Sequence, residues 1–307
     1  MALSACMQDR VAVVTGAGNG IGRAIALGLA RNGAAVVVND IGTSLGGEGR
    51  SDGPAHAVVR EIEAAGGRAV ASLESVADPA GAERTIRLAV AAFGRLDALV
   101  NNAGILRDRI FHKLSTEEWD AVLRVHLHGS FHMSRAAAAV FREQGSGSFV
   151  HMTSGAGLIG NVGQANYGAA KLGIVGLSRC IALDMHRAGV RSNCVAPVAW
   201  SRMTASIPAE TPEARALAAQ RRAEMDPAKV APLVAYLASE ASAHVTGQIF
   251  GVRGDEILVY SQPRALARVR SDAGWTVESI AATAMPRLDA SLTPLETTVD
   301  VSRAAAA

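Results

Sequence analysis

The stretch VAVVTGAGNGIG at residues 11–22 decides the fold of this chain. Its first five residues form a short apolar run, which is typical of a strand buried on both faces of a parallel sheet. The glycines that follow permit a tight turn and the close approach of a diphosphate to backbone N–H groups at the positive end of a helix. Their spacing is G-x-x-x-G-x-G, through Gly16, Gly20 and Gly22, and not the common G-x-G-x-x-G. The order of strand, glycine turn and helix favours a nucleotide site over an ordinary glycine-rich turn.

Outward from this stretch, short aliphatic runs alternate with longer amphipathic segments along most of the chain. The further runs occupy residues 34–39, 68–73, 96–101, 148–153, 190–195 and 248–252. The amphipathic segments occupy residues 21–31, 54–65, 79–93, 116–141 and 164–186. Repeated strand and helix units of this kind predict a doubly wound α/β domain, with helices on both faces of a parallel sheet.

Two segments fall outside this alternation. Residues 42–53 are rich in Gly and Ser and predict a long surface loop after the second strand. Residues 255–307 have few apolar positions and predict one or two short helices, packed as an extension on the domain. We therefore expect a Rossmann-type domain over residues 1–254 and an extension over 255–307, whose end from Ser302 to Ala307 is frayed.

Composition indicates a compact globular protein. Of the 307 residues, 49% are hydrophobic and 19% are charged, which excludes a disordered chain. The formal net charge of +2 is too small to indicate nucleic acid or an anionic membrane as a partner. Cys6, Cys180 and Cys194 show no metal-ligand spacing, so we expect a reducing compartment and no metal site. Because no apolar run approaches the ~18 residues of a membrane span and no targeting signal is recognisable, the cytoplasm is the expected location.

Asp40 stands at the end of the second predicted strand, 18 residues beyond Gly22. A carboxylate at this place can accept hydrogen bonds from both hydroxyls of an adenosine ribose, and it would repel a 2′-phosphate. Neither Asn19 nor Ile41 offers a cation to bind such a phosphate. These residues predict NAD as the cofactor in preference to NADP. The alternative is an acidic residue that only caps a loop.

Tyr167 and Lys171 lie four residues apart, so both side chains share one face of a predicted helix. An ammonium group near a phenol lowers the pKa of the phenol from ~10 toward working pH, which suits a general base. Such a pair by itself is common on solvated helices. Ser154, however, lies 13 residues earlier, directly after a buried strand, where the edge of a parallel sheet presents its ligands. The three residues together predict an active site.

These motifs resemble those of the short-chain dehydrogenase/reductase family. The resemblance rests on T-G-x-x-x-G-x-G at 15–22, N-N-A-G at 101–104, Ser154 and Y-x-x-x-K at 167–171. It covers residues 9–252 and implies a Rossmann-type sheet of about seven parallel strands.

The resemblance also implies roles for individual residues. Tyr167 would be the acid/base, Lys171 would bind the nicotinamide ribose and lower the pKa of Tyr167, and Ser154 would position the substrate oxygen. The implied cofactor-binding residues are Gly16, Asn19, Gly20, Ile21, Gly22, Asp40, Ser75, Val76, Asn102, Ala103, Gly104, Tyr167, Lys171 and Pro197.

Within the family, longer stretches look like the (3R)-hydroxyacyl-CoA dehydrogenase part of peroxisomal multifunctional enzyme type 2, also called 17β-hydroxysteroid dehydrogenase type 4. Bacterial single-domain relatives are similar. The stretches are residues 37–40, 101–109, 125–131, 164–167 and 201–204. This likeness implies NAD-dependent oxidation of the 3-hydroxyl of a (3R)-hydroxyacyl-CoA, derived from a fatty acid or a sterol side chain, by a homodimer or homotetramer.

Two alternatives stay open. A hydroxysteroid dehydrogenase would use the same groups on a ring hydroxyl. A catalytically silent, NAD-sensing interaction protein would keep the fold without the reaction, since one fold hosts unrelated functions. The complete set of Ser154, Tyr167 and Lys171 speaks against the silent protein.

The sequence departs from the family pattern at three places. His126 stands where most members have an Asn, whose main-chain carbonyl is held to bind a water on the route from Lys171 to solvent. His126 is therefore either a member of the catalytic site or only a helix residue. Glu74-Ser75-Val76 replaces the Asp that usually meets the adenine ring, and Pro197-Val198 replaces Pro-Gly.

Four further residues have an open assignment. Arg107 and Arg109 could attract the phosphates of CoA, or they could belong to a solvated loop. Trp200 and Met203 lie in the stretch that forms a substrate lid in the family, where they could line an apolar pocket or simply pack the loop.

Overall fold

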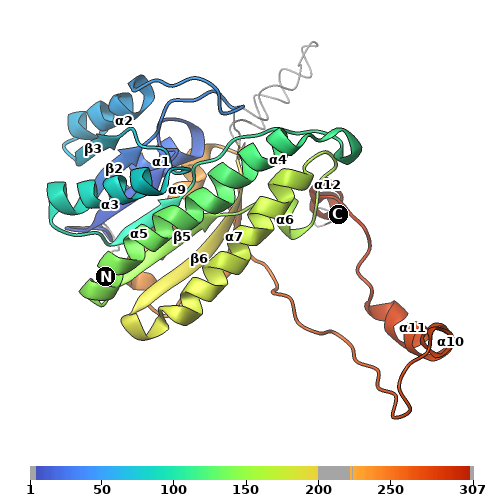
Figure 1. Cartoon of the computed structure of the whole chain (residues 1–307). Helices are drawn as coiled ribbons and strands as arrows, with labels where there is room; N and C mark the ends of the chain where they lie inside the picture. The colour runs from blue at the N-terminus through green and yellow to red at the C-terminus, as the bar shows by residue number, and fades with distance from the viewer. Residues whose placement is uncertain (1–4, 200–221, 223, 305–307) are drawn as a thin grey trace. The chain divides into compact units, whose positions relative to one another are not determined.

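A single sheet of eight strands runs through the domain, in the order β3-β2-β1-β4-β5-β6-β7-β8 (Figure 1). This computed structural model describes residues 5–199, 222 and 224–304. The strands are β1 (Val11–Thr15), β2 (Ala35–Asn39), β3 (Arg68–Ser72), β4 (Ala98–Asn101), β5 (Gly147–Met152), β6 (Val190–Val198), β7 (Ile249–Arg253) and β8 (Glu256–Val259). Every neighbouring pair from β3 to β7 is parallel, and β8 is antiparallel to β7.

The doubly wound parallel sheet expected from the sequence is confirmed, with one strand more than expected. Strand β8 follows β7 after a tight turn in which Gly254 has a φ of +56°. Its four residues are all exposed, so it lacks the buried apolar run that made the other strands recognisable. The extra strand lies within the range that we expected to belong to the extension.

Helices cover both faces of the sheet. The α-helices of this part are α1 (Gly20–Arg31), α2 (Gly53–Ala64), α3 (Pro79–Phe93), α4 (Thr116–Leu123), α5 (Gly129–Gln144), α6 (Gly155–Leu158), α7 (Ala165–Asp184) and α9 (Ala231–Ala238). Short 3-10 turns are η1 (Phe111–Lys113), η3 (His186–Ala188), η5 (Pro227–Val230) and η6 (Glu240–Ser242). One π-helical turn, η2 (Arg124–His128), joins α4 to α5 where the sequence predicts one continuous helix.

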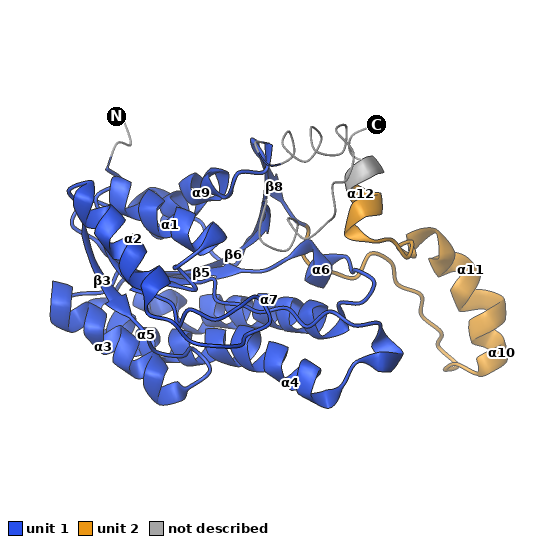
Figure 2. Ribbon diagram, turned by 90° about the horizontal axis from the view of Figure 1, so that it is seen from above, with its two compact units in different colours: residues 1–260 blue, residues 261–307 orange. Residues whose placement is uncertain are grey.

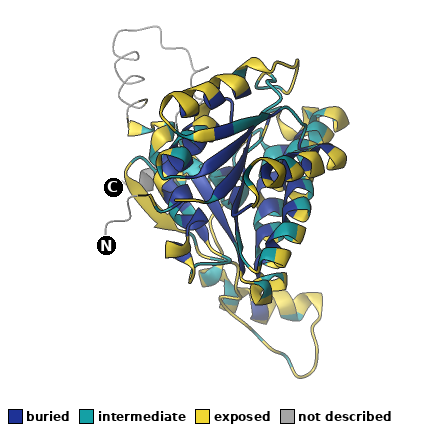
Figure 3. Ribbon diagram, turned by 90° about the vertical axis from the view of Figure 1, so that its left-hand side faces the viewer, coloured by how far each residue is buried: buried dark blue, intermediate teal, exposed yellow. Residues whose placement is uncertain are grey.

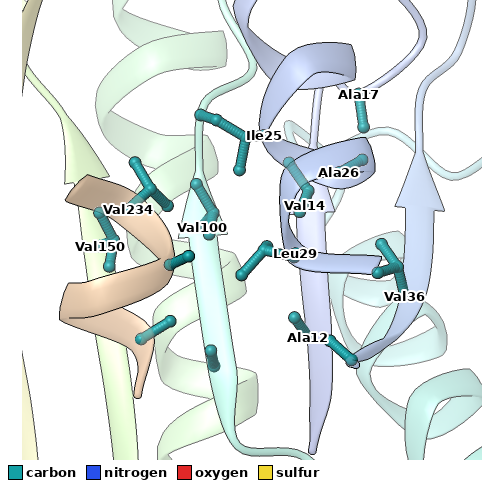
Figure 4. Close-up of a cluster of buried hydrophobic side chains, with 14 of the residues drawn as sticks. Ala12, Val14, Ala17, Ile25, Ala26, Leu29, Val36, Val100, Val150 and Val234 are labelled. Carbon is teal, nitrogen blue, oxygen red and sulfur yellow. The ribbon is translucent and has the colours of Figure 1, made fainter. Parts of the chain in front are cut away.

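Alternate residues of β1, β2, β4 and β5 enter two separate apolar clusters, one on each face. Val14 and Val100 pack with Ile25 and Leu29 of α1 and Val234 of α9 (Figure 4). On the other face, the partners come from α3 and α5. The central members of that second cluster are Val13, Val37, Leu99, Ile86, Met133, Phe141 and Phe149.

Burial on both faces explains why the strands read as continuous aliphatic runs. β1, β2 and β4 are buried at every position. Figure 3 shows these strands as the dark interior of the domain and the outward faces of the helices as exposed. Polar side chains that end the strands are therefore brought to one edge of a rigid, apolar sheet.

The chain divides into two compact units, residues 1–260 and 261–307 (Figure 2). The second contains α10 (Val277–Ser279), a π-helical turn η7 (Ile280–Ala284), α11 (Met285–Leu288), η8 (Asp289–Ser291) and α12 (Thr298–Ala304). Thr276 starts the first of these with a capping box to Ser279. The packing of the extension on the domain stays a prediction, and residues 305–307 of the expected frayed end lie outside the described residues.

No helix among the described residues is both long and apolar enough to cross a membrane.

Candidate active site

A cavity of about 220 Å³ lies at the carboxyl ends of the parallel strands. Open α/β sheets bind ligands at this edge, beyond the strand ends. Segments from β1, β2, β4, β5, α7 and the end of β6 all contribute to its wall. Asp40 follows β2 and Lys171 lies beside β5, so β1 and β4 separate the two ends of the cavity.

The glycine turn forms one wall through backbone atoms. Gly16 and Gly20 have φ of +63° and +53°, the left-handed region that favours glycine. A Cβ on Gly22 would lie 2.1 Å from the carbonyl oxygen of Gly16, and one on Gly16 would lie 2.7 Å from Cα of Ala103. Helix α1 begins at Gly20, and its first N–H groups have no acceptor within the helix. The wall is therefore built for a close-lying anion.

Asn102 ties this turn to the end of β4. Its Nδ2 donates to the carbonyl oxygens of Thr15, at 2.9 Å, and Gly16, at 3.1 Å. The Thr15 hydroxyl in turn accepts from the backbone N–H groups of Asn102 and Ala103, both at 3.0 Å. Asn102, Ala103 and Gly104 all line the cavity, as the sequence predicts. Thr15 is a structural member of the site that the sequence analysis quoted without a role.

Asp40 lines the end of the cavity opposite Lys171, and both of its carboxylate oxygens accept hydrogen bonds from the backbone. Oδ2 accepts from the N–H of Gly18 at 2.7 Å, and Oδ1 accepts from the N–H of Gly42 at 2.6 Å. Each oxygen keeps a second lone pair, so the carboxylate can still accept from a ligand. Gly18 must be glycine here, because a Cβ would lie 2.8 Å from Asp40 Oδ2.

Glu74, Ser75 and Val76 follow shortly after β3, and they are placed differently from one another. Val76 lines the cavity, and Glu74 lines it while its carboxylate binds Arg84 at 2.9 and 2.7 Å. This hydrogen bond lowers the pKa of Glu74. Ser75 is not among the lining residues, because its Oγ turns back to accept from the N–H of Ala77 at 3.2 Å. The structure thus does not place Ser75 on the cavity wall.

Tyr167 and Lys171 come together in the first two turns of α7, as predicted. The Nζ of Lys171 lies 5.6 Å from the centre of the Tyr167 ring and donates to the carbonyl oxygen of Met152 at 2.7 Å. Ser154 caps α6 and accepts from the N–H of Ala156 at 3.2 Å. Its hydroxyl lies near enough to the Tyr167 phenol to lower the pKa of that phenol, although Ser154 does not line the cavity itself.

Burial shifts the pKa values of Tyr167 and Lys171 at this end of the cavity. It raises the pKa of Tyr167, and the hydrogen bond from Ser154 lowers it in part. The charge of Asp108 raises the pKa of Tyr167 further, and the lowering by Lys171 that the resemblance implies stays a prediction. Burial also lowers the pKa of Lys171 to about 8. The ammonium group thus gives up its proton more easily than a lysine in solvent.

His126 sits in the π-helical turn η2, a kind of irregularity that is frequent at functional sites. Its Nε2 lies 2.8 Å from the carbonyl oxygen of Ile105, and its ring meets Tyr167 edge-on at 5.2 Å. Burial, reinforced by the charge of Lys171, lowers the pKa of His126 to about 3. Because the imidazole is then neutral near pH 7, these contacts favour a role in holding Ile105 over proton transfer. A Cβ on Gly104 would lie 2.2 Å from Cε1 of His126.

Pro197 lies at the end of β6 and lines the cavity, as the sequence predicts. Trp200, Met203 and the stretch 201–204 lie outside the described residues. Within the described part of the chain, no three His, Cys, Asp or Glu side chains are placed to share a metal ion.

Residues 10–211 match the short chain dehydrogenase family. The chain belongs to this family. Short-chain dehydrogenases are oxidoreductases that use a nicotinamide cofactor, so the prediction of an enzyme is confirmed. The glycine wall and Asp40 fit the diphosphate and the ribose of such a dinucleotide.

Two relatives extend the comparison. Hydroxyacyl-CoA dehydrogenase ChsB1 of Mycobacterium tuberculosis is 42% identical over 290 residues, which cover 90% of this short-chain dehydrogenase and 88% of ChsB1. Peroxisomal multifunctional enzyme type 2 of Mus musculus is 45% identical over 246 residues, which cover 80% of this chain but 32% of that enzyme. The resemblance found in the sequence is therefore confirmed.

Solved structures agree. A short chain dehydrogenase from Mycobacterium avium has a TM-score of 0.82 and 42% identity, and the match covers 95% of this chain and 98% of that one. A gluconate 5-dehydrogenase from Burkholderia cenocepacia J2315, in complex with NADP and tartrate, has a TM-score of 0.72 and 28% identity, over 83% of this chain and 98% of that one.

The sequence analysis missed one part of this dehydrogenase site. Thr43, Ser44 and Leu45, from the stretch treated as a surface loop, line the cavity, and so do Ile105 and Leu106. Gly and Ser content indicates a loop but not which way the loop folds, so the sequence holds no signal for this contact.

Proposed function

We propose that this chain is an NAD-dependent dehydrogenase that oxidises the 3-hydroxyl of a (3R)-hydroxyacyl-CoA to the 3-ketoacyl-CoA. The observation that carries the proposal is one cavity with Asp40 at one end and Tyr167, backed by Ser154 and Lys171, at the other. A dinucleotide is long enough to need both ends, and the hydroxyl to be oxidised then lies beside the phenol.

The chain's own residues handle the proton and the oxygen. Tyr167, once deprotonated, takes the proton of the substrate hydroxyl as the C–O bond becomes a carbonyl. Ser154 holds the phenol and can donate to the substrate oxygen. Lys171, whose Nζ lies 5.6 Å from the centre of the Tyr167 ring, stabilises the deprotonated phenol, and the proton that Tyr167 takes up leaves to solvent before the next cycle. Nicotinamide, when bound, accepts the hydride from the carbinol carbon.

Asp40 supports NAD as the cofactor. A 2′-phosphate on the adenosine ribose would face this carboxylate, which the backbone of Gly18 and Gly42 holds in place. Among the described residues that line the cavity, the one ammonium or guanidinium group belongs to Lys171, at the far end. A 2′-phosphate would thus meet a negative charge, and no cation of the described lining residues lies at this end.

The acyl-CoA substrate is supported by the relatives, ChsB1 above all, since its match extends over 90% of this chain. A sterol-derived acyl group, a homodimer or homotetramer and a cytoplasmic location belong to the same proposal and stay predictions.

The test is a panel of substrates with the purified full chain. NADH formation is measured with (3R)- and (3S)-hydroxyacyl-CoA thioesters, free 3-hydroxy acids and hydroxysteroids, each with NAD and NADP. We expect the (3R) thioester with NAD to have the highest kcat/KM. Faster oxidation of a hydroxysteroid, or equal use of both epimers, would replace the proposed substrate, and NAD binding without turnover of any alcohol would indicate a silent binding protein.

A further inference from the structure

The segment between β2 and α2, residues 42–52, is a compact loop that closes on itself. Where the two ends of the loop meet, the N–H of Ser51 donates to the carbonyl oxygen of Ile41 at 3.0 Å. Inside, the N–H of Ser44 donates to the carbonyl oxygen of Glu48 at 2.8 Å, and Gly47 donates to Ser44 at 3.0 Å. Loops of this kind, whose ends meet and whose interior is hydrogen-bonded, often carry function.

This loop forms the wall of the cavity next to Asp40. Thr43, Ser44 and Leu45 line the cavity beyond Ile41, at the end where the adenosine half of a dinucleotide would lie. The loop has few apolar groups of its own, so its position depends on what it is attached to.

The attachment is the segment after β4. The N–H of Leu106 donates to the carbonyl oxygen of Leu45 at 3.0 Å. The guanidinium of Arg107 makes two further contacts with the loop. Its Nε donates to the carbonyl oxygen of Gly46 at 2.7 Å, and its Nη2 donates to the carboxylate of Glu48 at 3.2 Å.

Arg107 is itself firmly placed. Its carbonyl oxygen accepts from Nδ2 of Asn166 at 2.9 Å, and Asn166 is fully buried next to Tyr167. Arg107 therefore connects the rigid start of α7 with a loop that would otherwise be held by one backbone hydrogen bond on this side. Nε and Nη2 both donate to the loop, and Glu48 already neutralises the charge of the guanidinium, which makes Arg107 a poor partner for the phosphates of CoA.

From this geometry we propose that Arg107 is a positioning residue for the cofactor: it holds the 42–52 loop as the wall of the adenosine end of the cavity and does not bind the acyl-CoA. The inference rests on the proposed function insofar as the cavity takes NAD. It concerns the adenosine half alone, so it can be tested without any acyl-CoA.

The first experiment measures the Kd of ADP-ribose, which carries the adenosine half without nicotinamide, by calorimetry. For Arg107→Ala we expect a Kd roughly 10-fold higher than for the unchanged protein, as the loss of a charged hydrogen bond predicts. Arg107→Lys should recover only part of this loss, because an ammonium lacks the fork that reaches Gly46 and Glu48 together. Arg109→Ala is the matched control with an unchanged Kd, since Arg109 binds Glu118 at 3.0 Å and does not touch the loop.

Steady-state kinetics separate a positioning role from a merely structural one. Arg107→Ala should raise the KM for NAD while kcat and the KM for the hydroxyacyl-CoA stay near the wild-type values. Glu48→Gln, which weakens one of the two contacts, should shift the Kd of ADP-ribose in the same direction by less, and it covers the case in which Arg107→Ala fails to fold.

Two results would overturn the inference. One is an unchanged Kd of ADP-ribose in Arg107→Ala with a raised KM for the acyl-CoA, which would return Arg107 to the substrate side. The other is full recovery by Arg107→Lys, which would show that only the charge matters. A wild-type protein that binds ADP-ribose but oxidises no hydroxyacyl-CoA would refute the proposed substrate and leave the role of Arg107 supported by the binding data.

Discussion

The two ends of the cavity are built in different ways. The wall near Asp40 consists mainly of backbone. A Cβ on Gly16 or Gly22 would meet neighbouring atoms, and Gly20 has open space but a positive φ that strains other residues. The end near Tyr167 consists of buried side chains from distant parts of the chain, and burial shifts the pKa of Lys171 to about 8. Shape therefore governs the first end, and proton affinity governs the second.

This difference predicts whether a substitution at each end changes turnover or cofactor binding. Loss of the Tyr167 hydroxyl at the catalytic end should alter turnover and leave cofactor binding largely intact. An added Cβ or a lost charge at the nucleotide end should alter cofactor binding first. The predictions below test this separation, beginning with the largest expected effect.

Tyr167→Phe should lower kcat by roughly 10²- to 10⁴-fold, which is the usual contribution of general acid/base catalysis. The ring and its contact with His126 stay, so the Kd for NAD should change little. Stopped-flow or steady-state NADH absorbance measures the first quantity and calorimetry the second. Ser154→Ala is the companion variant: because the Ser154 hydroxyl lowers the pKa of Tyr167, its loss should move the rise of kcat/KM to higher pH. A near-normal kcat for Tyr167→Phe would remove Tyr167 from the mechanism.

Gly22→Ala should weaken NAD binding by roughly 10- to 100-fold, because overpacking costs about 1–3 kcal/mol. The new Cβ would lie 2.1 Å from the carbonyl oxygen of Gly16, which cannot move without the turn. The control is Gly176→Ala, on α7, where a Cβ meets nothing within 4 Å. Equal NAD affinity in the two variants would show that the wall yields more easily than its geometry indicates.

Asp40→Ala should reduce the ratio of kcat/KM for NAD to that for NADP by roughly 10-fold, the loss of a hydrogen bond to a charged group. Asp40→Asn separates the two causes, since it keeps one acceptor for the backbone and removes the charge. Both variants should gain activity with NADP, and Asp40→Ala should lose more with NAD. A wild-type enzyme that uses NADP equally well would contradict the role given to Asp40.

A separate prediction concerns stability in acid, and neither turnover nor cofactor binding. Burial, with the charge of Lys171, lowers the pKa values of His126 and His151 to about 3 in the folded protein, from 6.5. The unfolded chain therefore binds more protons between these limits, and the free energy of unfolding falls as pH drops from about 6.5 toward 3. Each histidine contributes up to ~1.4 kcal/mol per pH unit.

His126→Asn should keep turnover and lose one of these two contributions. Urea unfolding at pH 7 and pH 5 measures the slope in both proteins, and the groups they share cancel in the difference. An unchanged slope would show that His126 is protonated in the folded state, and a large loss of kcat without loss of fold would return the imidazole to the catalytic site.

Local sequence was enough for the parallel strands β1 to β7, the glycine turn and the placement of Asp40. Each of these rests on neighbours in the chain: β1 is a buried aliphatic run at every position, and the turn after it needs glycine where φ is positive. Tyr167 and Lys171 could be paired from their spacing because a helix brings residues four apart onto one face. Their pKa shifts could not, because desolvation depends on what the rest of the chain packs around them.

Sequence by itself thus determined the parallel α/β fold, the nucleotide wall and the identity of the groups at the catalytic end. Only the tertiary structure decided that Ser75 turns away from the cavity, that β8 adds an antiparallel edge, and that His126 holds the backbone of Ile105. It also decided that Arg107 binds the 42–52 loop, while a third of its side chain stays exposed. The physical reason is the same in each case: these contacts join segments far apart in the chain, where side-chain direction and burial, and not residue spacing, select the partner.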